Sequence, residues 1–401
     1  MKRAHLQLTP LEEARRRFFD ALEKAGFFVA SEEEIETPQA LWRVTSREVL
    51  ARRAVPHFAS AAMDGIAVRA AQTQQASLQR PLRLVRGRDF EFIDTGQPIP
   101  PPFDAVIKIE DVQEFDSQTV VITRPTSAGK HVRAVGEDFA LGAQVVPAGF
   151  QLTPEAIAAL LSAGHLSVWV KRQLKAIFIP TGSELVSWRA EPQIGQFCET
   201  NSQIVAGLLE EWGALVTVHE IVPNEAERIR AALHQALGSY DLVLVGSGTS
   251  QGRGDLVPQI VQELGKVLVH GVAYHPGHPV LLGLGRGAIV GLPGYPVAAW
   301  LALHLFVKPV LERYYFGRER ERFKLRAKLA QPVKSARGYR EFVRARLERA
   351  ADGSYWVYPL QGGASKLSTI VNADGWIEVP EEIEAYEQNT FVEVTLVRGR
   401  P

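Results

Sequence analysis

The chain has 401 residues, 46% of them hydrophobic, and its 45 lysines and arginines balance 45 aspartates and glutamates. At about 100–200 residues per domain, this length predicts two to four domains, each able to bury a core. The balanced charge argues against a general binder of nucleic acid or of acidic membranes, although a local basic pocket is compatible with it. Cys198 is the only cysteine, which excludes an intrachain disulfide and favours the reducing cytoplasm.

The first predicted element is a helix that begins after Thr9, expected as its N-cap, and ends at Gly26. From about residue 42 to residue 170, short strands and turns dominate, including an alternating strand over 104–109. A second helix is expected to begin at the TPE sequence of 153–155, where a threonine can cap and a proline suits the first position, and to end at Gly164.

Near residue 171 the pattern changes to alternating strands and helices. The predicted strands cover 176–180, 215–222, 242–245, 267–272 and 288–290, and the predicted helices cover 202–212, 256–264 and 297–311, with one more that starts from a capping box at Asn224. This alternation predicts a mostly parallel sheet covered on both faces. The longest uncharged stretch, 287–307, contains two prolines and is therefore expected to form a strand, a turn and a helix rather than a membrane span.

After residue 318 the pattern becomes all-β. The runs 344–348 and 355–357 flank an Asp352-Gly353 turn, which predicts a hairpin, and the chain ends in an alternating strand over 390–397. The N-terminal residues lack the apolar segment of a signal peptide, so none is expected.

Loops rich in glycine and hydroxyl residues follow three of the predicted strands. They read TGSE at 181–184, GSGTSQGRGD at 246–255 and GLPGYP at 291–296. In an open α/β sheet, ligands bind beyond the carboxyl ends of the strands, where backbone N–H groups and helix N-termini attract anions. One such loop alone is better explained as a tight turn, but three together predict a site for a ligand that carries phosphate or another oxyanion.

Two features of these loops have alternative explanations. Asp255 can hold Mg²⁺ among phosphate-binding loops, or it can cap the helix that follows it. His270, His275 and His278 lie close together, but the Pro-Gly pair at 276–277 argues against a structural zinc site and favours donor groups that face an anion.

Three more polar clusters precede the α/β region. They are SAAMDG at 60–65, DTG at 94–96 and GED at 136–138, and each by itself is typical of a turn. The charged or polar residues near them are Lys108, Glu110, Lys130, His131 and Arg133.

Taken together and in this order, the motifs resemble those of the MoeA-type molybdopterin molybdenumtransferases, a family related to the C-terminal part of gephyrin. SAAMDGIAV at 60–68 resembles S-A-M-D-G-Y-A-V with one extra residue, and 95–106 resembles T-G-x-P-(I/L)-P followed by D-A-V. The further matches are GED at 136–138 to G-E-D, TGSEL at 181–185 to T-G-D-E-L, TNS at 200–202 to the (D/E)-(S/T)-N-S region, and GLPGYPV at 291–297 to G-L-P-G-(N/Y)-P-V. The resemblance covers the chain almost end to end.

The resemblance implies a multidomain α/β plus β fold. Its expected parts are an elongated linker domain (1–45 and 145–171), an inserted β-rich domain (46–144), a MogA-like α/β molybdopterin-binding domain with a mostly parallel sheet (172–318) and a C-terminal β-barrel (319–401). It also implies a cytoplasmic homodimer, with a site shared by the α/β domain of one subunit and the inserted domain of the other.

The implied reaction inserts molybdate or tungstate into adenylylated molybdopterin, with cleavage of the phosphoanhydride, release of AMP and assistance by Mg²⁺. The adenylyltransferase of the same pathway is an expected partner, and neither nucleic acid nor a membrane is expected.

The resemblance also implies roles for individual residues. The catalytic positions are Asp64, Thr95, Asp138, Glu184 and Asp255, and two of these, Glu184 and Asp255, are the implied metal ligands. The implied molybdopterin- or phosphate-binding positions are Thr181, Gly182, Gly246, Ser247, Gly248, Thr249, Ser250, Gly252, Pro293, Gly294 and Pro296. The implied oxyanion-binding positions are His275 and His278.

Departures from the family pattern leave a second hypothesis open. HPGHP at 275–279 stands where K-P-G-K-P is usual, and Gly271 aligns with a further lysine, so up to three positive charges are lost or depend on pH. The chain is therefore either an active transferase, which the retained acidic residues favour, or a catalytically weakened paralogue that binds, stores or scaffolds the cofactor. A third hypothesis, an adenylyltransferase or nicotinamide-nucleotide amidohydrolase, rests on the α/β region alone, and the motifs outside that region count against it.

Overall fold

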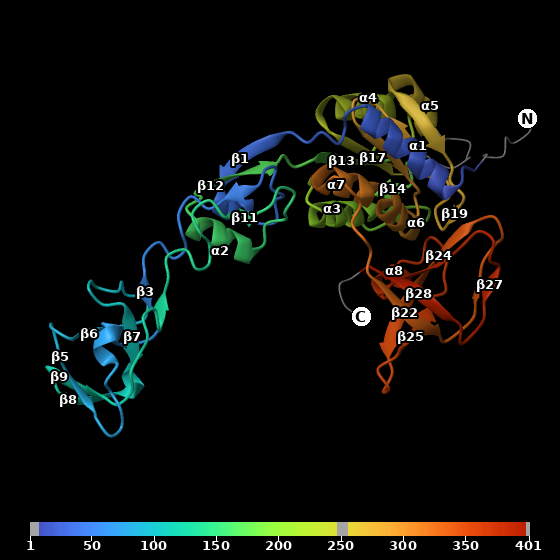
Figure 1. Cartoon of the computed structure of the whole chain (residues 1–401). Helices are drawn as coiled ribbons and strands as arrows, with labels where there is room; N and C mark the ends of the chain where they lie inside the picture. Colours follow the sequence, from blue (N-terminus) through green and yellow to red (C-terminus); the bar gives the residue numbers. More distant parts are fainter. Residues whose placement is uncertain (1–7, 247–255, 398–401) are drawn as a thin grey trace, which may run out of the picture. The chain divides into compact units, whose positions relative to one another are not determined.

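The computed structural model describes residues 8–246 and 256–397, and the chain divides into two compact units (Figure 1). We call Glu32–Lys171 the insertion unit, and Met1–Ser31 together with Arg172–Pro401 the main unit. The residues expected in one linker domain, 1–45 and 145–171, are divided between the two, because the N-terminal helix packs in the main unit. The boundaries within each unit stay a prediction.

Helix α1 (Leu11–Lys24) begins without the predicted side-chain cap. Pro10 is the N-cap residue, whereas the backbone N–H of Thr9 donates to the carbonyl of Gly271 at 3.0 Å, so the prediction that Thr9 caps the helix is wrong. The helix buries one apolar face, and Gly26 follows its end in the left-handed conformation (φ +71°), as expected of a C-terminal glycine.

A six-stranded sheet forms the centre of the main unit. Its strands, in spatial order, are β16 (Leu215–Val218), β13 (Lys175–Pro180), β17 (Leu242–Gly246), β21 (Ala288–Leu292), β20 (Leu281–Leu284) and β18 (Lys266–His270). All pairs are parallel except those of β20, which runs antiparallel to both of its neighbours. The mostly parallel sheet is therefore confirmed, but the sequence prediction missed β20, a short apolar run that closes a hairpin with β21.

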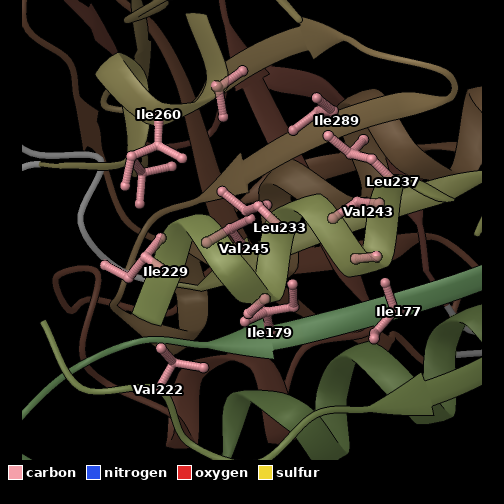
Figure 2. Packing of buried hydrophobic residues seen from close by; sticks show 14 of the residues in the cluster. Ile177, Ile179, Val222, Ile229, Leu233, Leu237, Val243, Val245, Ile260 and Ile289 are labelled. Carbon is pink, nitrogen blue, oxygen red and sulfur yellow. The ribbon is translucent and has the colours of Figure 1, made fainter. Parts of the chain in front are cut away.

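Helices cover both faces of this sheet, and α4 (Ala226–Ser239) and α5 (Val257–Leu264) pack on one of them (Figure 1). Figure 2 shows Ile179, Val243 and Val245 of the sheet against Leu233 of α4 and Ile260 of α5. Each such side chain contributes about 1.5–3 kcal/mol when it is fully buried.

The opposite face of the sheet is covered by α3 (Asn201–Glu211) and by α6 (Pro296–Ala302), which continues through a π-helical turn (Leu303–Val307) into α7 (Lys308–Phe316) (Figure 1). The predicted capping box at Asn224 does not form. Glu225 is the N-cap residue of α4 and makes no side-chain cap, and the N–H of Asn224 instead donates to Ser183 Oγ at 3.1 Å.

The C-terminal part of the main unit is a closed five-stranded barrel. Its strands are β24 (Arg340–Arg349), β25 (Tyr355–Pro359), β22 (Lys324–Leu329), β28 (Phe391–Leu396) and β26 (Gly375–Val379), and β26 pairs again with β24. The predicted hairpin is β24–β25, and Gly353 in its turn has φ +84°. A short strand from the α/β part, β19 (Tyr274–His275), adds to β24 in parallel.

Aromatic rings connect the barrel to the helices of the α/β part. His304 of the π turn packs against both Trp300 and Trp376, whose ring centroids lie 4.6 and 5.5 Å from its own and 5.7 Å from each other. Because the ring is buried, the pKa of His304 lies well below its ordinary value and the imidazole is neutral at pH 7. These contacts fix the barrel against α6 within the main unit.

The insertion unit contains two three-stranded sheets that share a core. One sheet has the order β6 (Phe90–Ile93), β4 (Gly65–Val68), β7 (Ala105–Lys108), and the other has β5 (Leu82–Val85), β9 (Thr119–Ile122), β8 (Val112–Asp116). Ile66, Phe90 and Ile107 of the first sheet pack with Leu84 and Ile122 of the second. The strand predicted over 104–109 is confirmed as β7.

The other part of the insertion unit packs α2 (Pro154–Ser162) against short strand pairs. These pairs are β1 (Glu32–Glu36) with β12 (Ser167–Lys171), and β2 (Val49–Leu50) with β11 (Gln144–Val146). The predicted start and end of α2 are confirmed, because Thr153 Oγ1 accepts from Ala156 N at 3.3 Å and Gly164 follows the helix with φ +93°.

The uncharged stretch 287–307 forms β21, a turn and α6 with its π turn, as predicted. Among residues 8–246 and 256–397, no helix is both long and apolar enough to cross a membrane.

Candidate functional site

Three parallel strands of the main unit end at the same level of the sheet. Pro180 of β13 lies opposite Gly246 of β17, which lies opposite Leu292 of β21. The residues that follow the outer two strands, Thr181 and Pro293, therefore leave from one edge. The carboxyl ends of β13, β17 and β21 therefore lie side by side, which is the arrangement expected if the loops after them form one site. The predicted site residues that lie outside the described part of the chain are Ser247, Gly248, Thr249, Ser250, Gly252 and Asp255.

The loop after β13 uses some of the donors that were expected to face an anion. Thr181 is buried, and both its N–H and its hydroxyl donate to the carbonyl of Gly246 at 2.8 Å. The N–H of Gly182 donates to Val222 O at 3.0 Å. Thr181 and Gly182 therefore shape the loop, and the amides left without a partner in the described chain are those of Ser183 and Glu184.

Glu184 presents an exposed carboxylate at this edge. The carboxylate makes no hydrogen bond or ion pair with the described residues. A Cβ atom on Gly182 would lie 2.8 Å from Glu184 Oε1, so the glycine makes room for the carboxylate above the strand end.

Gly246 is a glycine for a packing reason. A Cβ atom at this position would lie 2.5 Å from Cζ of Phe178, whose ring crosses the end of β17. The residue therefore lets an aromatic ring support the edge from which the predicted anion-binding loop begins.

The loop after β21 is held from two sides. Pro293 is buried and Gly294 is exposed, and the side-chain amide of Asn201 donates to Gly294 O at 2.9 Å. Pro296 occupies the first turn of α6, and Val297 N donates to Ala364 O of the barrel region at 3.0 Å.

The loop that carries the histidines leaves from the same sheet edge. His270 at the end of β18 lies opposite Leu281, which lies opposite Gly291, so β18 ends about where β21 does. The rings of His275 and His278 have centroids 5.4 Å apart, and His275 lies 4.5 Å from the ring of Tyr339.

Burial decides the charge of these histidines. It lowers the pKa of His275, and burial together with the neighbouring His275 lowers the pKa of His278. Without a bound anion both rings are therefore neutral at pH 7, and they gain a positive charge in more acidic solution. Gly271, which aligns with a family lysine, has φ +88°, a conformation in which a lysine would be strained.

Sequence reasoning missed two charged residues of β24, the barrel strand that pairs with this loop. Glu341 lies opposite His275 in the β19–β24 pairing, and burial raises its pKa. Arg344 is buried, donates to the carbonyls of Phe342 (2.9 Å) and Gly362, and has its pKa lowered by burial. Strand alternation could have indicated that Arg344 is buried, because it places Arg344 on the same face of β24 as the buried Phe342.

In the insertion unit, the structure brings Asp64 and Thr95 together. Asp64 Oδ1 accepts from the N–H of Thr95 at 2.6 Å, and this bond lowers the pKa of the carboxyl group. Both residues are exposed. Hydrogen bonds between Gly96 N and Ala61 O (2.8 Å), and between Ala61 N and Gln97 O (2.9 Å), join the two segments.

Asp138 follows a strand pair in the same unit. β10 (Val132–Arg133) pairs with β3 (Ser60–Ala61), and the chain then turns at Gly136, with φ +72°. Arg133 binds the carboxylate of Glu137 at 2.5 Å. The carboxylate of Asp138 is exposed, and among the described residues nothing joins it to Asp64 or Thr95.

The described residues contain no group of three or more histidine, cysteine, aspartate or glutamate side chains arranged to hold a metal ion.

Three family models match successive parts of the chain. The MoeA N-terminal region (domain I and II) matches residues 9–164, a probable molybdopterin binding domain matches 177–313, and the MoeA C-terminal region (domain IV) matches 326–397.

Relatives of the whole chain agree with these models. A molybdopterin molybdenumtransferase of Synechococcus elongatus is 32% identical over 378 residues, which cover 88% of this chain and 91% of the relative. A molybdopterin molybdenumtransferase of Bacillus subtilis is 28% identical, over 97% of this chain and 94% of the relative. The crystal structure of a molybdopterin biosynthesis MoeA protein from Pyrococcus horikoshii superposes with a TM-score of 0.81 at 30% identity, over 98% of this chain and 100% of that one. The chain therefore belongs to the MoeA family of molybdopterin molybdenumtransferases.

Proposed function

We propose that this chain inserts molybdate or tungstate into adenylylated molybdopterin, with cleavage of the phosphoanhydride and release of AMP. The observation that carries the proposal is the shared edge of β13, β17 and β21, in the region that matches a probable molybdopterin binding domain. Loops at such an edge bind the phosphates of a substrate through backbone N–H groups. The backbone N–H groups of Ser183 and Glu184, which have no partner among the described residues, and the exposed Gly294 support this role.

The carboxylates have separate roles in the proposal. Glu184, which lies at the sheet edge, and Asp255 would hold Mg²⁺, whereas Asp64, Thr95 and Asp138 would act in the insertion of the metal. The hydrogen bond from Thr95 supports the role of Asp64, because it keeps that carboxylate ionised and oriented.

The donor chemistry of Glu184 fits Mg²⁺. The ion prefers one or two carboxylates together with substrate phosphates and water, rather than a cage of protein ligands. An exposed carboxylate without a partner in the described chain is such a ligand. When bound, Mg²⁺ would neutralise charge on the phosphoanhydride.

His275 and His278 are the proposed oxyanion ligands. As neutral rings at pH 7 they can each offer one N–H donor to molybdate, and they gain a second donor and a positive charge in more acidic solution. The proposed molybdopterin site would be lined next to α6 by Pro293, Gly294 and Pro296.

A cytoplasmic homodimer that receives its substrate from the adenylyltransferase of the pathway completes the proposal. The single cysteine, Cys198, is compatible with a reducing compartment.

A second function has a specific observation in its favour. Two neutral histidines replace lysines of the family pattern, and the backbone at Gly271 disfavours the third lysine. These changes weaken the local positive charge, which favours a paralogue that binds or stores the cofactor without turnover.

Release of AMP distinguishes the two functions. Purified protein is incubated with adenylylated molybdopterin and Mg²⁺, with and without molybdate, and AMP is measured by chromatography. The transferase produces AMP when molybdate is present. Substrate that binds but stays intact after prolonged incubation contradicts the transferase and favours the binding paralogue. Competition between molybdate and tungstate in the same assay identifies the preferred oxyanion.

A further inference from the structure

A cleft of about 240 Å³ opens on the insertion unit, and none of the predicted site residues lines it. It is bounded by residues from two segments that are separate in the sequence, 106–111 and 124–131. Lys108 ends β7, Arg124 follows β9, and Lys130 precedes β10. Asp111 adds one carboxylate to the lining.

The three cations of the cleft have no ion-pair partner among the described residues. Other arginines of the unit, such as Arg86 and Arg133, are paired with glutamates. With Asp111 counted, the lining carries a formal surplus of two positive charges when His131 is neutral. A concave site with unpaired like charges attracts a counter-ion of opposite sign.

Backbone hydrogen bonds hold the segment that carries two of these cations. The carbonyl of Lys130 accepts from Val106 N at 2.9 Å, and Gly129 N donates to Asp104 O at 2.8 Å. Thr126 N donates to Thr73 Oγ1 at 3.0 Å. Because the main chain of the segment is anchored at these points, it loses little further conformational entropy when a ligand binds.

The cleft also offers neutral donors. The hydroxyl groups of Thr126 and Ser127 line it and have no hydrogen-bond partner in the described chain. His131 Nδ1 lies 3.1 Å from Val106 O, and since a carbonyl can only accept, Nδ1 carries the proton. The other ring nitrogen, Nε2, is then an acceptor that can take a hydrogen bond from a hydroxyl group of a ligand.

We propose that this cleft binds a tetrahedral dianion, the class that includes molybdate and the phosphate monoesters. Two surplus positive charges match a dianion, and the hydroxyl groups match oxygen atoms that accept hydrogen bonds. The volume is below the roughly 300–1,000 Å³ of pockets that enclose drug-sized ligands, so it holds one oxyanion group and its nearest atoms rather than a whole nucleotide. The site is independent of the reaction proposed above.

Pyridoxal 5′-phosphate tests this site locally, because it carries a phosphate monoester and an aldehyde that forms an imine with a nearby lysine. The full-length protein is treated with this probe, the imine is reduced with borohydride, and the tagged lysines are mapped by mass spectrometry. We expect Lys108 or Lys130 to be tagged about tenfold faster than the exposed Lys334 of the main unit.

A matched pair of variants checks that the cleft directs the reaction. Arg124→Gln removes a lining cation and lowers the rate of tagging at Lys108 and Lys130 about tenfold. Arg80→Gln removes an exposed cation of the same unit that does not line the cleft and has no ion-pair partner among the described residues, and it leaves the rate unchanged. Rates at Lys108 and Lys130 that equal the rate at Lys334, or that respond alike to both variants, overturn the proposal.

Protection experiments identify the ligand within the class. Inorganic phosphate, AMP and molybdate are each added before the probe, and the expected result is that at least one slows the tagging of Lys108 or Lys130 but not of Lys334. Protection by molybdate assigns an oxyanion store to the insertion unit, and protection by AMP assigns a nucleotide phosphate. If none of the three protects, the cleft does not bind this class of anion.

Discussion

Asp64 is the predicted catalytic residue whose chemistry is most clearly fixed by a single contact. The N–H of Thr95 points at its carboxylate, and the resulting decrease in pKa keeps the group ionised throughout the range in which the protein is expected to work. The carboxylate is exposed, so this contact sets its charge and direction rather than the stability of the fold.

Replacing Asp64 by asparagine separates its charge from its hydrogen bond. The side-chain amide oxygen of the variant would still accept from Thr95 N, so the loop should keep its structure, but we expect the rate of AMP release to fall about 100-fold. The matched control is Asp94→Asn in the same turn, where the carboxylate accepts from the side chain of Gln97 at 3.1 Å and the rate should stay within about twofold. Equal rates in both variants would remove Asp64 from the mechanism.

Protonation of the histidine loop makes oxyanion binding depend on pH. A lowered pKa means that His275 and His278 gain their positive charges only as the pH falls below 6.5, so molybdate should bind more tightly at pH 5.5 than at pH 7.5. His278→Lys carries its charge at both values and should bind about tenfold more tightly than the parent protein at pH 7.5. Titration calorimetry at a series of pH values measures both effects, and a flat profile from pH 5.5 to 8 in the parent protein contradicts this role.

The motifs predicted which loops lie at the strand ends of the sheet, but not which of their backbone N–H groups lack a partner in the described chain. Thr181 and Gly182 were expected to offer donors to an anion, yet their N–H groups bind Gly246 O and Val222 O. Arg344 carried no motif and emerged only when the barrel buried it beside Gly362. Hydrogen bonds between segments far apart in the sequence decide these cases, and a single sequence does not encode them in its local pattern.

At the scale of elements, the apolar runs and the glycines predicted most of the helices and strands of the α/β part. The strand β20 was missed because its run Leu-Leu-Gly-Leu is short and contains a glycine, although the Gly-Arg-Gly sequence of 285–287 separates it from β21. Capping was predicted less well, because Thr9 and Asn224 have the right side chains but use their N–H groups for contacts with other segments. Tertiary contacts overrode local preference at both helix ends.

The end of β17 tolerates no side chain at Gly246. Gly246→Ala would place a Cβ atom 2.5 Å from Cζ of Phe178, so the ring or the strand must move, and we expect the free energy of unfolding to fall by about 2 kcal/mol. Gly207→Ala is the control, since this exposed glycine of α3 has nothing within 4 Å of a new Cβ atom, and the variant should gain about 0.5–1 kcal/mol. Urea denaturation followed by circular dichroism measures the two shifts, and equal midpoints for both variants would show that the strand end is not tightly packed.

At the scale of the whole molecule, the order of the motifs predicted the fold class, and the structure adds where the N-terminal helix belongs. Arg340 of the barrel binds Glu12 of α1 at 2.8 Å, and Arg15 of α1 binds Glu319 at 2.6 Å, so α1 is part of the main unit. The pattern of residues 9–26 predicts a helix but not its partner, because many apolar surfaces can accept the same helical face.

The assembly proposed for this chain is a homodimer. Light scattering coupled to size-exclusion chromatography should give a mass of twice the 44.3 kDa of one chain, independent of loading concentration in the micromolar range. A mass equal to one chain would contradict the dimer without affecting the assignment to the family.

The central claim is that this chain transfers a metal oxyanion to molybdopterin rather than only binding the cofactor. A single-turnover reaction with adenylylated molybdopterin, molybdate and Mg²⁺ tests it directly, with AMP measured by chromatography and molybdenum on the pterin by mass spectrometry. We predict one molybdenum atom on the pterin for each AMP released, and no AMP without the oxyanion. Intact substrate, or AMP released with a pterin that carries no metal, would contradict the claim.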